Sequence, residues 1–500
     1  MRPFPSADAG SVPSADAVRT EGVACGHDGS RRSAHDRRPA GPSCSDASDL
    51  LFYAALALLP VDGLVWGVQM PYWSPCSPVL FLAYALCNAR LLPRLLAKRF
   101  PALAPMLALL AAVSAFGWLT VGVNATYALR TVLAMACAAC TLLAFAVAWS
   151  VKRLPMRAAV NVLVCAYACA FLFGVFTWLI QPGRVNLPKV SGTLMGWFLR
   201  QYFTSRPQFL FAEPSYIGMH LFGVLLPMFW LTRDRRLPIV VVTFAAGALA
   251  MGSGVRIALD SVCALALCLM AVCPWRRVWR DRRLLGAVCA GVMAVCAAAA
   301  AAVWSQPRLR ALFHEGLLAG DDSMSARIFR SVAPLTAGVH DWPHLLFGFG
   351  AGNLGEAMRR GYAATLSWYQ DAGGRMSVEI AELRDPLGST GNLAGNAFTM
   401  NAYVSFVTEF GLVAFAAASA LIIRHVTRRH AWNARTVCWL LLLAYLHLQF
   451  EAYAFYALPL FLWATAEPRM MDMLNFSRHA SVHSYDHSIA DSAADIRKDM

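Results

Sequence analysis

Apolar residues fill this chain in long continuous blocks, and short polar segments separate one block from the next. A helix needs roughly 20 apolar residues to cross a bilayer. Lipid offers no hydrogen bonds to exposed backbone, so such blocks are expected to be helices. The pattern predicts an all-α polytopic membrane protein with about twelve transmembrane helices. The predicted spans are residues 50–68, 77–96, 102–122, 128–150, 157–180, 213–232, 237–253, 256–274, 284–304, 397–423, 435–450 and 452–467.

The basic residues between these blocks predict a topology. Arginine and lysine clusters fall on alternate sides of successive spans, and the other connections contain almost none. Clusters of this kind mark cytoplasmic loops, so both termini are predicted to be cytoplasmic. Two large segments, 181–212 and 305–396, are then outside. The second is too long for a simple connector, and we expect an extracytoplasmic loop subdomain with helical pieces near 307–318 and 324–338.

The chain therefore divides into five predicted parts. Residues 1–48 are rich in Ser, Ala, Asp, Gly, Pro and Arg and cannot bury enough apolar surface to fold. They form a predicted disordered cytoplasmic tail, and residues 468–500 form another. Residues 49–304 hold the first nine helices, 305–396 the large outer subdomain, and 397–467 the last three helices.

Composition excludes a soluble protein. The chain of 500 residues is 58% hydrophobic and only 14% charged, with a mean hydropathy of +0.50. Soluble chains carry about 25% charged residues. The net charge of +14 follows the topology and does not indicate nucleic acid. Cys137 and Cys140 fit a CxxC spacing, but they lie in a spanning segment, which favours packing over redox chemistry.

Glu213 is the first ionisable residue that the chain places at the edge of a membrane span, where burying a charge costs free energy. It stands in RPQFLFAEPSYIG, residues 206–218, directly before Pro214 and the sixth predicted span. Proline suits the first turn of a helix, and a carboxylate beside the positive end of the helix is stabilised. One interpretation is a helix terminus, with Arg206 as a loop residue that pairs with Glu213. The other is a functional site.

Arg256 is the second such residue. It follows the glycine turn GSGVR, residues 252–256, at the start of the eighth predicted span. Asp260 lies four residues further on the same helical face and could pair with it. Ionisable residues inside membrane segments usually mark functional sites.

Two arginines in the outer loop complete the set. Arg327 and Arg330 lie three residues apart in SARIFRS, so a helix would project both to one side. Guanidinium groups bind phosphate oxygens in pairs and stay charged at any pH. Arginines facing outward at the membrane surface favour a lipid that carries a diphosphate head. Fixed cations would stabilise that diphosphate as it leaves.

These motifs, in this order and on the predicted outer face of the membrane, resemble those of the O-antigen polymerase and O-antigen ligase superfamily. That superfamily includes exopolysaccharide polymerases. The resemblance covers roughly residues 200–425. Besides the three motifs above, it includes LLFGFGAGN at 345–353 and NAYVSFVTEFGLVAF at 401–415. It implies an integral-membrane glycosyltransferase of the bacterial inner membrane that needs no metal or cofactor. Its substrates would be undecaprenyl-pyrophosphate-linked oligosaccharides, and a chain-length regulator and a flippase would be its partners.

The resemblance also implies roles for individual residues. Arg256 and Arg327 would hold the pyrophosphate, and Glu213 would orient or deprotonate the acceptor hydroxyl. The other residues of the matching motifs would contribute to substrate binding: Arg206, Ser215, Tyr216, Arg330 and Asn401.

One departure from the family pattern bears on the reaction. Ligases and many polymerases have a His-Asn pair ahead of the tenth span, and this chain has Met400-Asn401. This disfavours a ligase and leaves Glu213, His340 and His344 as bases to test. A lipid-linked oligosaccharide flippase or polysaccharide transporter is the alternative of another class. Transporters, however, place their polar sites near the bilayer midplane. A non-catalytic assembly partner is a further alternative.

Overall fold

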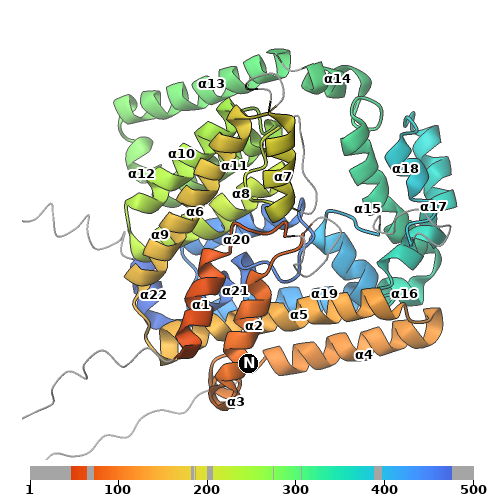
Figure 1. The fold of residues 1–500 in the computed structure, drawn as a ribbon, viewed down its shortest axis with the longest axis horizontal. Helices are drawn as coiled ribbons and strands as arrows, with labels where there is room; N and C mark the ends of the chain where they lie inside the picture. The colour runs from red at the N-terminus through yellow and green to blue at the C-terminus, as the bar shows by residue number, and fades with distance from the viewer. Residues whose placement is uncertain are drawn as a thin grey trace, which may run out of the picture. The chain divides into compact units, whose positions relative to one another are not determined.

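The computed structural model describes residues 47–64, 73–181, 185, 187–199, 206–273, 275–305, 307–387 and 397–475. Helices make up nearly all of these ranges (Figure 1). The predicted tail therefore lies outside the described residues up to Asp46, and so do residues 476–500 of the second tail.

The helices of the first half are α1 (Ala47–Ala57), α2 (Ser77–Cys87), α3 (Leu92–Lys98), α4 (Leu103–Val121), α5 (Ala125–Phe145), α6 (Met156–Leu179), α7 (Pro188–Phe198), α8 (Ile217–His220), α9 (Leu226–Thr232), α10 (Arg236–Ala250) and α11 (Val255–Val272). The helices of the second half are α12 (Trp275–Val278), α13 (Arg282–Ser305), α14 (Pro307–Glu315), α15 (Asp322–His340), α16 (Trp342–Phe347), α17 (Leu354–Asp371), α18 (Val378–Glu382), α19 (Ala402–Arg428), α20 (Ala434–His447), α21 (Ala457–Ala466) and α22 (Pro468–Asn475). Four short helical turns join some of these: η1 (Ala89–Leu91), η2 (Ala146–Val151), η3 (Pro214–Tyr216) and η4 (Leu221–Leu225).

The chain is a multi-pass membrane protein by the length and hydropathy of its helices. Five helical segments among the described residues are long and apolar enough to cross a membrane, or six if the bent pair Ser77–Cys87 and Ala89–Lys98 is one span. The five are Leu103–Val121, Ala125–Val151, Met156–Leu179, Pro214–Thr232 and Ala402–Arg428. The predicted count of twelve is not supported.

The other predicted spans do form helices, but several are too short. Helices α1, α10, α20 and α21 have 10 to 15 residues. At 1.5 Å per residue a helix of 14 residues is about 21 Å long, which is less than the roughly 30 Å of hydrocarbon. The second predicted span bends by 69° at Asn88, between α2 and the segment Ala89–Lys98. Hydropathy alone cannot tell such buried pieces from full spans.

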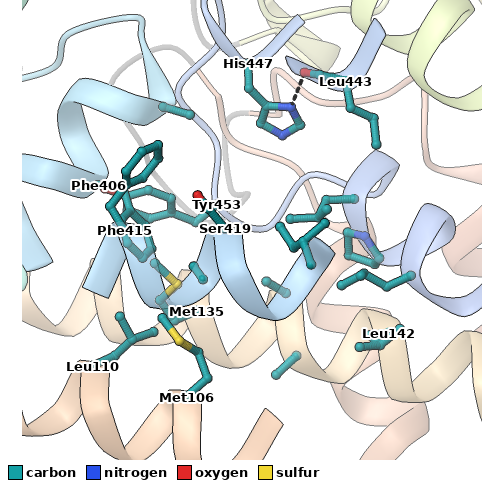
Figure 2. Close-up of a pocket in the computed structure, with 18 of the residues that line it drawn as sticks. Met106, Leu110, Met135, Leu142, Phe406, Phe415, Ser419, Leu443, His447 and Tyr453 are labelled. Carbon is teal, nitrogen blue, oxygen red and sulfur yellow. Dashed lines mark hydrogen bonds between the residues drawn. The ribbon is translucent and has the colours of Figure 1, made fainter. Parts of the chain in front are cut away.

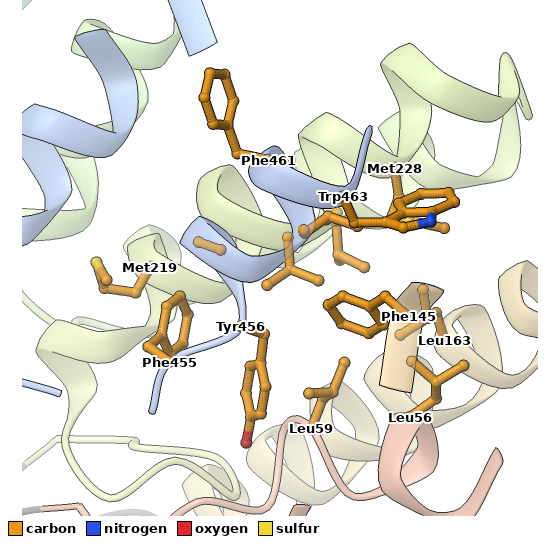
Figure 3. Close-up of a cluster of buried hydrophobic side chains, with 14 of the residues drawn as sticks. Leu56, Leu59, Phe145, Leu163, Met219, Met228, Phe455, Tyr456, Phe461 and Trp463 are labelled. Carbon is orange, nitrogen blue, oxygen red and sulfur yellow. The ribbon is translucent and has the colours of Figure 1, made fainter. Parts of the chain in front are cut away.

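The main hydrophobic core is built from segments that are far apart in the sequence. Figure 3 shows part of it, with side chains from α1, α5, α6, α8, α9 and α21 packed together. Phe145, Tyr456 and Trp463 are almost fully buried there. The core therefore fixes the segment around Pro214 against the last helices of the chain.

The described residues of the segment 305–396 have a core of their own, and we call this segment the outer subdomain after its predicted position. Its described residues form α14 to α18, and α15 packs closely along α17. The shared core residues are Ala326, Phe329, Ala333, Leu354, Met358, Tyr369, Ile380 and Leu383. The predicted helical pieces at 307–318 and 324–338 correspond to α14 and α15. Helix α15 carries Arg327.

The expectation of a disordered tail from residue 468 is wrong for its first eight residues, which form α22. Two arginines hold the end of this helix. Arg233 donates to the Met473 carbonyl, and Arg435 donates to the carbonyls of Met473 and Leu474. These bonds satisfy carbonyl groups that a helix leaves unpaired at its C-terminus.

Gly361 allows the close approach of α15 and α17. A Cβ at this position would lie 1.8 Å from the Ala333 carbonyl oxygen. We expect Gly361→Ala to destabilise the protein by about 1–3 kcal/mol, because overpacking forces the two backbones apart. Gly286→Ala in α13, where nothing lies within 4 Å, is the control. Thermal unfolding of the purified protein in detergent measures both. Equal melting temperatures for the two variants would refute the prediction.

Candidate functional site

Glu213 lies at the start of the helical segment Pro214–Thr232, and its side chain faces the outer subdomain. Its backbone is extended, and the side chain makes no hydrogen bond to the helix N-terminus. Glu213 Oε1 lies 3.6 Å from Nη2 of Arg327 on α15, and the two side chains are 9% and 27% exposed. Glu213 therefore has an ionic partner in the outer subdomain and is not a capping residue.

Arg256 lies in the first turn of α11, directly after a turn whose backbone angles favour glycine. Gly252 and Gly254 have φ values of +82° and +132°, which side chains other than glycine rarely adopt. Arg256 interacts electrostatically with both Glu213 and Arg327. The motifs at 206–218, 252–256 and 325–331 therefore meet in one place, as the sequence predicts.

Arg206 reaches the same glycine turn. Its Nη1 lies 3.9 Å from the point that a Cβ on Gly254 would occupy. Gly254 precedes Arg256 by two residues, so Arg206 lies beside the turn that carries Arg256. We call Arg206, Glu213, Arg256 and Arg327 the arginine cluster.

Several polar atoms of this region are buried and have no hydrogen-bond partner among the described residues. They are Nε and Nη1 of Arg256, Oε2 of Glu213 and Oγ of Ser215. Leaving a buried polar group unpaired costs about 1–3 kcal/mol, and more when the group is charged. The Arg256 and Ser215 donors are what an anion such as a diphosphate would satisfy.

Asp260 interacts electrostatically with Arg256, as its spacing predicted, but the two groups are too far apart to form an ion pair. In the described part of the chain no ion pair joins the two, and Arg256 Nη2 instead donates to the Gln449 carbonyl at 2.6 Å. Asp260 accepts from the Tyr445 hydroxyl at 2.8 Å. The Arg256 guanidinium is therefore held in place by a backbone carbonyl, while its Nε and Nη1 have no hydrogen-bond partner among the described residues.

The other predicted binding residues have packing roles in the structure. Arg330 is buried and lies 4.0 Å from the centre of the Phe398 ring. Asn401 caps α19 by accepting from the backbone amides of Tyr403 and Val404. Tyr216 is buried, and its ring meets the Phe450 ring edge-on at 4.4 Å. Of these three, Tyr216 interacts electrostatically with Glu213.

The two histidines proposed as bases lie elsewhere. His340 is exposed at the end of α15, and its Nδ1 lies 2.8 Å from the Thr336 carbonyl oxygen. His344 in α16 is buried between Thr120 and Asp341. Among the described residues neither has a hydrogen bond or ion pair to the arginine cluster.

The connection between α20 and α21, residues 448–456, contacts the arginine cluster, and sequence reasoning missed it. Gln449 binds Arg256, Phe450 packs on Tyr216, and Glu451 accepts from the backbone amides of Thr399 and Met400. The available signal was Glu451, a lone carboxylate between two predicted spans.

A buried polar network underlies Glu213 and was also missed. Asp62 accepts from the amide of Ala212, the residue before Glu213, and from Nε2 of His220 at 2.9 Å. An ionised carboxylate only accepts, so Nε2 donates, and Nδ1 of a neutral ring accepts from the Tyr167 hydroxyl at 2.8 Å. Asp62, His220 and Tyr167 are fully buried. The network fixes the backbone that carries Glu213.

Removal of Asp62 is expected to be strongly destabilising. Asp62→Ala leaves the His220 ring and the Ala212 amide buried without an acceptor, which costs about 3 kcal/mol or more. The control is Asp371→Ala at the exposed end of α17. A melting temperature of Asp62→Ala equal to that of the wild type would show that the network contributes no stability.

Two adjoining cavities lie beside α19. The larger has a volume of about 320 Å³ and is lined almost entirely by apolar side chains of α4, α5, α19, α20 and α21 (Figure 2). The smaller, about 40 Å³, is lined by polar groups that include Arg130, Glu409 and Glu451. Tyr453 lines both. Hydrocarbon fits the first cavity, and the second presents two carboxylates.

Neither a protein-family model nor a curated protein matches the sequence. Among the described residues, no group of three or more His, Cys, Asp or Glu side chains could hold a metal ion.

Proposed function

We propose that this protein is a polysaccharide polymerase of the bacterial inner membrane. It would transfer a growing undecaprenyl-pyrophosphate-linked glycan onto a lipid-linked repeat unit at the periplasmic face. The product would be O-antigen, capsule or exopolysaccharide. Both termini would be cytoplasmic in this arrangement, and the arginine cluster would face the periplasm.

The observation that carries the proposal is the meeting of Arg256 and Arg327 at Glu213. A diphosphate bears several negative charges, and more charge develops on it as the sugar–oxygen bond breaks. Preorganised cations lower the barrier for such a step because they need no rearrangement during it. The unpaired Nε and Nη1 of Arg256 are donors of the kind that phosphate oxygens accept.

Glu213 gives the cluster its balance of charge. Two guanidinium groups side by side repel one another, and a carboxylate between them offsets that repulsion when no substrate is bound. Glu213 Oε1 pairs with Arg327 and so orients it. The apolar cavity of about 320 Å³ adds a place in the same molecule where part of a polyprenyl chain fits.

Product analysis tests the proposal and separates it from the alternatives. The gene is deleted in its host, and gels resolve lipid-linked and exported glycans. Loss of long glycan with accumulation of single lipid-linked repeats is the result expected for a polymerase. Accumulation of long glycan that is not attached to its acceptor identifies a ligase instead. Lipid-linked repeats retained on the cytoplasmic side identify a flippase, and unchanged glycan contradicts all three functions.

A further inference from the structure

The chain segment that contacts Arg256 also carries a second carboxylate, Glu451. In the connection 448–456, Gln449 accepts from Arg256 at 2.6 Å and Phe450 packs against Tyr216. Glu451 is the next residue. The position of Glu451 is therefore tied through two consecutive neighbours to residues of the cluster and of the 206–218 motif.

Glu451 is held from the opposite side by the segment before α19. Its Oε2 accepts from the amides of Thr399 and Met400 and from the Thr399 hydroxyl. Met400 has a φ of +59°, a conformation that few residues other than glycine adopt. Strained backbone of this kind persists where surrounding contacts enforce it. Glu451 is one of those contacts, and it lines the smaller cavity.

Glu213, the carboxylate of the arginine cluster, faces the Arg327 guanidinium. Its Oε1 pairs with Arg327, and its Oε2 is buried. A carboxylate between guanidinium groups serves to orient them. Met400 offers no basic atom, because a thioether does not take up a proton at neutral pH. Glu451 lines the smaller cavity, so an acceptor hydroxyl in that cavity would meet it.

We propose that Glu451 is the general base that activates the acceptor hydroxyl. This inference rests on the proposed function. The Glu451 carboxylate takes the proton of the acceptor hydroxyl while that oxygen bonds to the anomeric carbon of the donor glycan. The bond between that carbon and the diphosphate oxygen breaks, and its electron pair leaves with the lipid diphosphate. The new glycosidic bond and a protonated Glu451 result, and Glu451 then returns its proton to water.

The environment of Glu451 suits a base. Burial raises the pKa of the Glu451 carboxyl, while hydrogen bonds from Ser405, Thr399 and Met400 oppose this. A base is most effective when its pKa lies near the working pH. Tyr127, Arg130, Glu409 and Tyr453 are the other ionisable groups that line the same cavity.

The test compares Glu451→Gln with the wild type in lipid nanodiscs that contain lipid-linked repeat units. Glutamine keeps an oxygen that can accept from Thr399 and Met400, so folding should be preserved. We expect turnover to fall about 100-fold with an unchanged KM for the lipid-linked donor. The rise of turnover with pH that the base produces in the wild type should disappear. Glu379→Gln, an exposed carboxylate on α18, is the control and should behave as the wild type.

Each other outcome has a definite meaning. If Glu451→Gln polymerises within threefold of the wild type, Glu451 is not the base. A loss of turnover that keeps the pH dependence of the wild type assigns Glu451 a structural role and also overturns the inference. If Glu451→Gln does not fold, Glu451→Asp replaces it and must retain the pH dependence at reduced turnover. If the wild type makes no polymer at all, the proposed function fails, and the role of Glu451 fails with it.

Discussion

Arg256→Ala and Arg327→Ala are each expected to abolish long glycan while the protein remains in the membrane. The loss should reach about 1,000-fold in the rate of transfer, because each variant removes a fixed cation from the leaving diphosphate. Chain length is measured on gels of glycan from a deletion strain that carries each variant, and insertion is measured by membrane fractionation.

The matched control for these variants is Arg359→Ala. Arg359 is an exposed arginine on α17 in the same outer subdomain, and it pairs with Glu356. It should leave chain length unchanged. Arg256→Lys keeps the charge but not the paired geometry of a guanidinium, so it should restore only part of the activity. If both Arg256→Ala and Arg327→Ala make glycan of wild-type length, the proposal that these arginines bind the diphosphate is wrong.

Glu213→Gln is expected to reduce transfer about 100-fold with little effect on expression. The neutral amide cannot balance Arg256 and Arg327, and it leaves Arg327 without its ionic partner. A loss of about 2.7 kcal/mol in transition-state stabilisation corresponds to that factor. Transfer rate and protein level are measured on the same membranes.

A different result for Glu213→Gln would be equally informative. If glutamine supports wild-type transfer, the negative charge is unnecessary and Glu213 has only a local structural role. Glu379→Gln controls for the general effect of removing a carboxylate.

The sequence predicts Glu213 and Arg256 because an ionisable residue is unfavourable at the border of a long apolar segment, and it predicts Arg327 from the pair of arginines in the large loop. The structure brings these three residues together. The same reasoning placed Arg330 and Asn401 with them, but these residues lie against Phe398 and at the N-terminus of α19. Residue type and spacing do not show which side of a helix another segment will cover.

The network beneath Glu213 could not be predicted from the sequence. Asp62, His220 and Tyr167 come from three segments, and each is an ordinary polar residue within apolar surroundings. The contact of Gln449 with Arg256 spans 193 residues of sequence. Interactions of this kind follow from packing and leave no local pattern.

The number of membrane spans could not be predicted from hydropathy either. A hydropathy block specifies that a segment avoids water, but not whether it crosses the bilayer. Helix α20 ends at His447 after 14 residues, and the chain then continues without regular structure through Gln449 and Glu451. That interruption prevents two full spans and at the same time places Gln449 against Arg256.

Binding of a polyprenyl diphosphate tests the central claim most directly. The purified protein in nanodiscs is titrated with a polyprenyl diphosphate and, separately, with the corresponding polyprenol, for the wild type and for Arg256→Ala. We predict that the wild type binds the diphosphate at least tenfold more tightly than the alcohol, and that Arg256→Ala loses this preference. Equal affinity of the wild type for both lipids would contradict a diphosphate site formed by Arg206, Arg256 and Arg327.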